Sequence, residues 1–137
     1  MVTAFDVPAA HLIYEIKEDL KGKIEAPAWT GSVKTGCQAQ RPPTQKDWYY
    51  SRAASLLRRL YTQGPVGTER LRTVYGGRKS RGSRKNKHQR SGGKVIRMLL
   101  QQFEKLEFVS KTPKGRTLTP KGVSYVDHLA HKASLKG

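Results

Sequence analysis

The sequence is poor in carboxylates, and one long stretch has none at all. Only 10 of its 137 residues are Asp or Glu, against 27 Lys or Arg, which gives a net charge of +17. The 34 residues from Arg70 to Phe103 contain 11 Lys or Arg and no carboxylate. Like charges at this density repel one another until an anion neutralises them. The composition therefore predicts a polyanionic partner, with nucleic acid as the leading class.

The chain has a single cysteine, and signal patterns and long apolar runs are missing. Cys37 stands alone and cannot form an internal disulfide, and no signal pattern opens the chain, so we expect a reducing, cytoplasmic setting. The longest apolar stretches, such as residues 98–100, are far shorter than a membrane span. An anionic membrane surface would require a basic amphipathic helix, whereas the basic segment is rich in Gly, Ser and Asn. We therefore expect no membrane partner.

The residues that catalysis or metal binding would need are not assembled in any recognisable spacing. His128 and His131 have only Asp127 beside them, which is too few ligands for zinc, so we expect them to face solvent or phosphate. Cys37 lacks a paired histidine in a recognisable context, and no glycine-rich loop ends in Gly-Lys-Ser/Thr. The sequence predicts no enzyme activity, no metal, no cofactor and no small-molecule substrate.

Apolar residues at helical spacing predict five helices in one domain spanning residues 1–137. We expect them at about 8–22, 44–63, 68–75, 93–107 and 119–133, with Thr44, Thr68 and Thr119 as caps. Residues 22–46 predict an irregular wrapping segment pinned by Trp29 and Val33, with Trp29 buried rather than stacked on a base. Half of the acids lie within the first 25 residues, in and around the first predicted helix, so we expect this N-terminal part to face away from the polyanion.

A short hairpin is predicted near the C-terminus, where residues 108–111 and 116–119 flank a turn at 112–115. Four helices thus precede any strand, and a closing helix follows. This order is that of a winged-helix domain with an extra N-terminal helix, in which the hairpin at 108–119 is the wing. The segment also resembles the wing of many bacterial and archaeal DNA-binding regulators, a likeness that identifies a fold more than a ligand.

The second predicted helix has two different faces. Its core face carries Tyr49, Ala53, Leu56, Leu57, Leu60 and Tyr61. Opposite it, Trp48, Arg52, Ser55 and Arg59 form a predicted basic ridge, flanked by Arg58. Since no carboxylate occurs from Ser51 to Gly67, we expect Arg52 and Arg59 to contact phosphates. Trp48 either stacks on a base or belongs to the core.

Two further surfaces complete the predicted interface. The segment 76–93, bracketed by glycine pairs, should be a poorly ordered loop that becomes ordered on RNA. The turn of the wing carries a cationic tip. The predicted contacts outside the second helix are Arg78, Lys79, Arg81, Arg84, Lys85, Lys87 and Arg90 in the loop, Lys94 after it, and Lys111, Lys114 and Arg116 in the wing.

Several motifs together resemble one known family. They are Pro27-Ala28-Trp29, Val33 to Gly36, Asp47 to Ser55, Tyr75-Gly76-Gly77-Arg78, Leu100 to Glu104 and Leu118 to Gly122. The chain is similar to the family of small-subunit ribosomal proteins numbered nineteen in the eukaryotic series (S19e), particularly its archaeal form. It departs from the family pattern at Gln38-Ala39-Gln40 and in the stretch Lys87 to Arg90.

The resemblance implies a mostly helical winged-helix fold in the head of the small ribosomal subunit. It implies binding to the small-subunit ribosomal RNA beside other head proteins, and a part in maturation and assembly of the subunit. It also implies that Trp48, Arg52 and Arg58 in the central helix and Arg78 in the basic loop face RNA. The alternative is a winged-helix transcription regulator, which should dimerise on duplex DNA.

Overall fold

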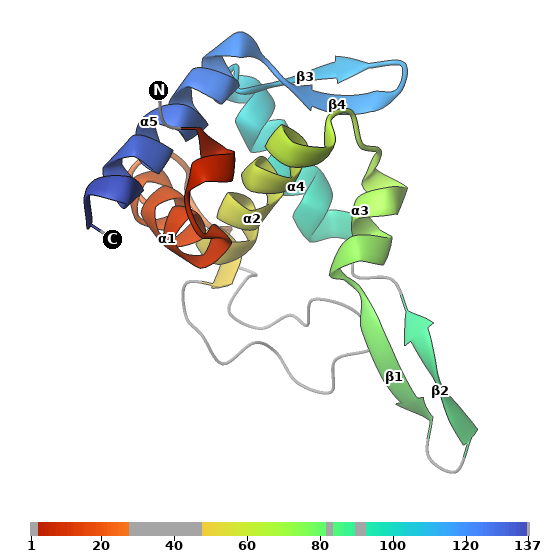
Figure 1. Cartoon of the computed structure of the whole chain (residues 1–137). Helices are drawn as coiled ribbons and strands as arrows, with labels where there is room; N and C mark the ends of the chain where they lie inside the picture. Colours follow the sequence, from red (N-terminus) through yellow and green to blue (C-terminus); the bar gives the residue numbers. More distant parts are fainter. Residues whose placement is uncertain (1–2, 28–47, 82–83, 90–92, 137) are drawn as a thin grey trace.

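The computed structural model describes residues 3–27, 48–81, 84–89 and 93–136, which are mainly helical (Figure 1). The helices are the short 3₁₀ helix η1 (Ala4–Asp6), α1 (Ala9–Leu20), α2 (Trp48–Gln63), α3 (Thr68–Tyr75), α4 (Gly93–Lys105) and α5 (Pro120–Lys136). The strands form two antiparallel pairs, β1 (Gly77–Arg81) with β2 (Arg84–Gln89), and β3 (Val109–Thr112) with β4 (Gly115–Leu118).

The predicted helices are confirmed in number and approximate position, but their caps differ. Thr119 caps α5 as expected, because the Gly122 amide donates to its hydroxyl oxygen at 3.2 Å. Thr68 is instead the first residue of α3, and Gly67 occupies the cap position. Thr44, Trp29 and Val33 lie outside the described residues.

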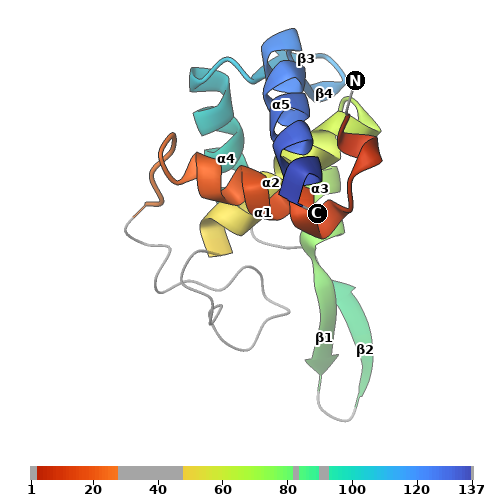
Figure 2. The same ribbon diagram turned by 60° about the vertical axis from the view of Figure 1, so that its left-hand side comes forward.

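The core forms around α2, whose apolar face is buried as the periodicity predicted. Ala53, Leu56 and Leu57 are fully inaccessible, and α1, α5 and β4 pack against this helix (Figure 2). Each leucine buried in this way stabilises the fold by about 1.5–3 kcal/mol. On α5 the buried residues are Val126, Leu129, Ala130 and Ala133, whereas Val123 in the first turn is 36% exposed.

Tyrosine hydroxyls join the helices across this core. The hydroxyl of Tyr49 donates to Gln102 Oε1 of α4 at 2.7 Å, and that of Tyr125 in α5 donates to Asp19 of α1. Tyr61 donates to Asp127 Oδ1 at 2.7 Å. Burial raises the pKa of Tyr49 and Tyr125 above the ordinary tyrosine value, so both phenols stay neutral donors. These bonds fix the position of each helix along its neighbour.

The C-terminal hairpin is confirmed, and a third segment pairs with it. Its register places Val109 opposite Leu118 and Thr112 opposite Gly115. The amide and carbonyl of Val66, between α2 and α3, exchange hydrogen bonds of 3.0 and 2.9 Å with Arg116. Gly115 has a φ of +124°, and a Cβ there would lie 2.6 Å from the Val66 backbone. Only glycine fits this approach.

The expectation of an irregular loop at 76–93, and of four helices before any strand, is wrong. Residues 77–81 and 84–89 pair as the antiparallel strands β1 and β2 between α3 and α4. Neither strand contains an apolar residue. Strand prediction from sequence depends on alternating apolar and polar residues, so this hairpin gives no such signal.

The end of α4 also differs from the prediction, which extended the helix to residue 107. The amide of Phe108 donates to the Phe103 carbonyl at 3.0 Å and that of Glu107 to the Glu104 carbonyl at 3.1 Å. Glu107 adopts a φ of 65°. These features close the helix in a Schellman motif, in which glycine is the usual residue at the position of Glu107. Without that glycine, the sequence gives no stop signal before 107.

Candidate nucleic-acid interface

An aromatic ring lies over the arginines of the central helix. The guanidinium carbon of Arg52 lies 4.3 Å, and that of Arg59 5.9 Å, from the centre of the Tyr75 ring. Ser55 lies about one helical turn from each of the two arginines, and its Oγ is hydrogen-bonded to the Tyr75 hydroxyl at 2.9 Å. Arg52, Ser55 and Arg59 thus share one stripe of α2. Tyr75, the last residue of α3, covers this stripe.

The three arginines Arg52, Arg58 and Arg59, which we call the arginine cluster, carry positive charge without a described counterion. None of them forms an ion pair with a residue that the structure describes. The Nε atoms of Arg58 and Arg59 are buried, and no described residue supplies a hydrogen-bond acceptor to them. Burial lowers the pKa of Arg52, and Tyr75 opposes this shift, but a guanidinium stays charged in water. The cluster can therefore still bind anions.

Trp48 belongs to the core, one of the two places that the sequence left open for it. It does not extend the predicted basic ridge, because it is only 8% exposed. Its ring meets that of Tyr49 edge-on, with centroids 6.0 Å apart. The stripe of α2 that carries Arg52 and Arg59 is also not free, because the Tyr75 ring lies over it. Contact between Trp48 and RNA stays a prediction.

The basic segment predicted as a loop forms a hairpin that extends away from the helices (Figures 1 and 2). Its register places Lys79 opposite Lys87 and Arg81 opposite Arg84, with an irregularity between Lys79 and Arg81. Like charges at opposed positions destabilise a strand pair, so a bound polyanion would stabilise this one. The predicted contacts Arg78, Lys79, Arg81, Arg84, Lys85 and Lys87 lie on its strands, whereas Arg90 lies outside the described residues.

The β3–β4 hairpin, predicted as the wing, contributes fewer available cations than predicted. Lys111 and Lys114 are exposed at its turn. Arg116, however, donates from Nε to Glu104 Oε1 of α4 at 2.7 Å, and its side chain is 21% exposed. This ion pair holds β4 against α4. Lys94 is exposed near the start of α4, close in sequence to the base of the hairpin. Contact of all four side chains with RNA stays a prediction.

Tyr75 is the residue that the sequence-based list of contacts missed. Its apolar spacing with Leu71 and Val74 predicted a helix, and this obscured a second role for its ring. The one hint in the sequence was that Tyr75 directly precedes the glycine pair Gly76-Gly77 and Arg78, at the start of the basic segment. Only the three-dimensional structure shows that the ring meets arginines 16 and 23 residues earlier in the chain.

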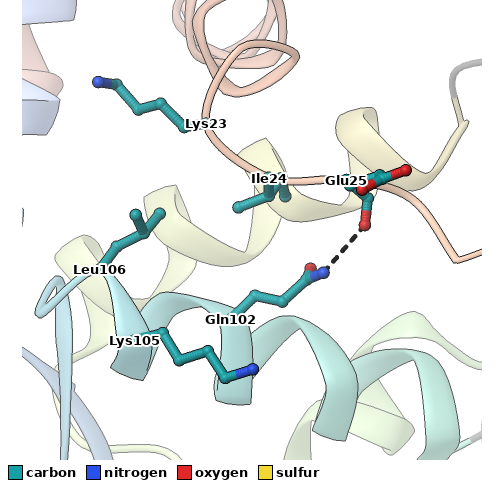
Figure 3. A pocket seen from close by; sticks show the side chains of 6 residues that line it. All are labelled: Lys23, Ile24, Glu25, Gln102, Lys105 and Leu106. Atoms are coloured by element: carbon teal, nitrogen blue, oxygen red, sulfur yellow. Dashed lines mark hydrogen bonds between the residues drawn. The ribbon is translucent and has the colours of Figure 1, made fainter.

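A shallow pocket of about 210 Å³ lies between the segment after α1 and the helix α4 (Figure 3). Gln102 crosses it, donating from Nε2 to the Glu25 carbonyl at 3.0 Å. The amines of Lys23 and Lys105 do not converge in it, and Lys23 Nζ lies 5.7 Å from the centre of the Tyr125 ring. The pocket therefore assembles no group of side chains suited to catalysis.

The other sequence candidates for chemistry remain separate in the structure. His128 and His131 are exposed on α5, and no three His, Cys, Asp or Glu residues gather within the described ranges. Cys37 lies outside them. Among the helices of the described ranges, none combines the length and apolar character needed to cross a bilayer.

Comparison with known proteins agrees with the resemblance seen in the motifs. The family model described as "Ribosomal protein S19e" matches residues 3–136. Small ribosomal subunit protein eS19 of Aeropyrum pernix is 46% identical over 137 residues, covering 96% of this chain and 90% of the relative. The Thermoplasma acidophilum eS19 is 42% identical (95% and 88% covered), and eS19G of Ascaris suum is 40% identical (91% and 87% covered). The chain belongs to the ribosomal protein S19e family.

Proposed function

We propose that the chain is a structural, non-catalytic component of the small ribosomal subunit that binds the small-subunit ribosomal RNA. Family membership over nearly the whole chain supports this assignment. The observation that assigns RNA binding to particular residues is the state of the arginine cluster. It lacks ion-pair partners in the described part of the chain and retains buried Nε donors. A folded protein that keeps such cations partly dehydrated is prepared for an anionic ligand.

Three surfaces would clamp the RNA: the arginine cluster, the β1–β2 hairpin, and the wing tip with Lys111 and Lys114. Most contacts should go to phosphates and ribose, because A-form RNA hides its major-groove base edges from side chains. Recognition would then depend on RNA shape. If about six phosphates are neutralised, affinity should fall with salt with a log–log slope on the order of −4 to −5.

We also propose that α2 to β4 form a winged-helix unit. The chain runs through α2, the paired Val66, α3, α4 and then the hairpin β3–β4, so three helices precede the hairpin that would be the wing. The bridge between Val66 and Arg116 supports this assignment, because it adds a third strand segment at the base of the hairpin. The β1–β2 hairpin would be an insertion into this unit, and α1 an N-terminal addition.

The site in the head of the subunit, the neighbouring head proteins and the role in maturation are further parts of the proposal. Of the acids on α1, Glu18 is exposed, whereas Glu15 is buried and Asp19 accepts the hydrogen bond of Tyr125. The exposed carboxylate of Glu18 would suit a protein neighbour better than RNA, since carboxylates repel phosphates.

The direct test is a chain carrying Arg52→Gln and Arg59→Gln. Glutamine keeps much of the side-chain length and removes the charge, which suits these half-buried positions better than glutamate. We expect affinity for a small-subunit ribosomal RNA transcript to fall about tenfold or more, since each charge-assisted contact contributes roughly 1.5–3 kcal/mol. Filter binding measures the loss, and cosedimentation with small subunits in sucrose gradients measures assembly.

The matched control removes two positive charges elsewhere, with Lys21→Gln and Lys132→Gln on the exposed surfaces of α1 and α5. It should bind nearly as the unaltered chain does. Equal losses in the two variants would show that net charge, not the arginine cluster, determines binding. A chain absent from small subunits, and bound to duplex DNA as tightly as to the RNA, would support the transcription-regulator alternative instead.

A further inference from the structure

We infer that Tyr75 is a positioning residue, whose ring holds the guanidinium groups of Arg52 and Arg59 in place for RNA phosphates. This inference rests on the proposed function and adds to it a residue that makes no charged contact itself. It follows from the contacts that join the end of α3 to one stripe of α2.

The geometry places one ring between two cations. Arg52 and Arg59 are seven residues apart, so they lie two turns apart on the same face of α2. The Tyr75 ring centre lies 4.3 Å from one guanidinium carbon and 5.9 Å from the other, both within cation–π range. Ser55 lies between the two arginines and hydrogen-bonds the Tyr75 hydroxyl at 2.9 Å. That bond fixes the ring, and the ring restricts both arginines.

The kind of partner matters as much as the geometry. A carboxylate would hold an arginine in place too, but it would neutralise the charge and occupy the N–H donors that recognise phosphate. An aromatic face attracts the cation and leaves its in-plane N–H groups free. No carboxylate of the described residues pairs with Arg52 or Arg59. The ring thus orders the two side chains before binding without neutralising their charge.

Ordering before binding has a measurable benefit. A free arginine loses rotamer freedom when it binds a phosphate, and this loss weakens affinity. If the Tyr75 ring has already restricted both side chains, this rotamer freedom is lost during folding and its loss no longer weakens binding. Tyr75 also directly precedes Gly76 and β1, so the same ring lies at the base of the basic hairpin. The arginine cluster therefore lies close to the base of the hairpin.

A double-mutant cycle on the full chain tests this role. Tyr75→Leu is combined with Arg52→Gln and Arg59→Gln, and affinity is measured for a transcript of the small-subunit ribosomal RNA of Aeropyrum pernix. In the otherwise unaltered chain, Tyr75→Leu should weaken binding about fivefold, as two cation–π contacts and their ordering effect imply. In the double-glutamine background it should change affinity less than about twofold, because no guanidinium remains to be positioned.

Two measurements separate positioning from a purely structural role. Tyr75→Phe keeps the ring and loses only the Ser55 bond, so it should retain most of the affinity. In the free protein, the ¹H–¹⁵N resonances of the Arg52 and Arg59 Nε groups should carry a ring-current shift that Tyr75→Phe preserves and Tyr75→Leu abolishes. The control Tyr14→Leu removes an exposed ring of α1 that lies 5.1 Å from Lys17 Nζ, and should leave RNA affinity unchanged.

The outcomes distinguish this inference from the proposed function. An equal loss from Tyr75→Leu in both backgrounds, or a collapse of helix content in that variant, would overturn the positioning role while leaving the arginines as contacts. If the double-glutamine chain binds the transcript as tightly as the unaltered chain, the proposed contacts of these arginines fail, and the positioning role fails with them.

Discussion

The two hairpins of this molecule have similar local architecture and opposite relations to the rest of the fold. β1–β2 and β3–β4 are both short antiparallel pairs. The β3–β4 hairpin, which is the wing of the proposed winged-helix unit, is tied to the helices at several points. The β1–β2 hairpin extends away from them, and among the described elements its strands pack extensively only against each other (Figure 2).

The wing is held by the fold itself. Val66 pairs with Arg116 through two main-chain hydrogen bonds, and Arg116 also forms an ion pair with Glu104. At its base, Phe108 is buried and stacks on Tyr125 with ring centroids 4.5 Å apart. Backbone pairing, burial and charge therefore all specify one position for the wing, independently of any ligand.

The β1–β2 hairpin contains no apolar residue to bury, and an isolated two-stranded hairpin is at best marginally stable in water. Its opposed like charges reduce that stability further. The comparison teaches that one motif can serve two purposes: in the wing the fold stabilises the strands, whereas in the basic hairpin the partner would do so.

Removal of the basic hairpin should have the largest effect on binding. We expect replacement of residues 77–89 by a short Gly/Ser linker to reduce affinity for the ribosomal RNA transcript about 100-fold, because several phosphate contacts are lost together. The salt dependence of binding should become shallower. The melting temperature should hardly change, and calorimetry measures this. A large fall in melting temperature would show that the hairpin supports the fold as the wing does.

Disruption of the wing should instead affect stability. Gly115→Val places a Cβ against the Val66 backbone at a φ of +124°, so we expect the free energy of unfolding to fall by about 3 kcal/mol. Urea denaturation measures the change. Gly67→Ala is the matched control, since a Cβ there meets nothing within 4 Å. If both variants unfold at the same urea concentration, the wing is not fixed by the close approach to Val66.

Tyr125→Phe should have a smaller effect at the base of the wing. It keeps the stack on Phe108 and removes the hydrogen bond to Asp19, which should cost about 1.5 kcal/mol of unfolding free energy. Because burial raises the pKa of Tyr125 in the folded state, its contribution is present below pH 10 and falls as the pH rises above that value.

Urea denaturation from pH 7 to 11 checks both the size and the sign of the Tyr125 effect. The unaltered chain should lose more stability above pH 10 than the variant does. Tyr14→Phe, at an exposed position on α1, provides the control and should match the unaltered chain. A parallel loss in all three proteins would assign the alkaline sensitivity to other groups.

The smallest expected effect comes from the ion pair on the wing. Glu104→Gln should lower the free energy of unfolding by about 0.5–1 kcal/mol, since both side chains are partly exposed. The difference should shrink in 1 M salt, which screens the pair. Thermal melting at low and high salt measures it. RNA affinity should stay within about twofold, whereas a strong gain would identify Arg116 as a contact that Glu104 restrains.

The sequence predicts those parts of the fold that depend on the spacing of apolar residues and on helix caps. The spacing of Leu56, Leu57 and Leu60 located the core face of α2, and Thr119 located the start of α5. Charge composition likewise indicated an anionic partner. These signals are local, because each depends on residues within one element.

What the sequence could not predict depends on packing between elements. The burial of Trp48 depends on neighbours that periodicity along α2 alone does not reveal. The Tyr75 ring at the end of α3 meets Arg52 of α2, and Arg116 of β4 pairs with Glu104 of α4; both contacts join separate elements, so no local pattern in the sequence predicts them. The β1–β2 pairing was missed for a different reason: its strands contain polar residues alone, so the usual pattern is absent.

The tyrosine bonds across the core have a consequence for handling the protein. Tyr49, Tyr61 and Tyr125 join the helices through short, partly buried hydrogen bonds that salt screens weakly, whereas phosphate contacts weaken steeply with salt. Concentrated salt should therefore detach the chain from RNA while leaving it folded. Such protein, returned to low salt, should be ready for reconstitution into particles without a refolding step.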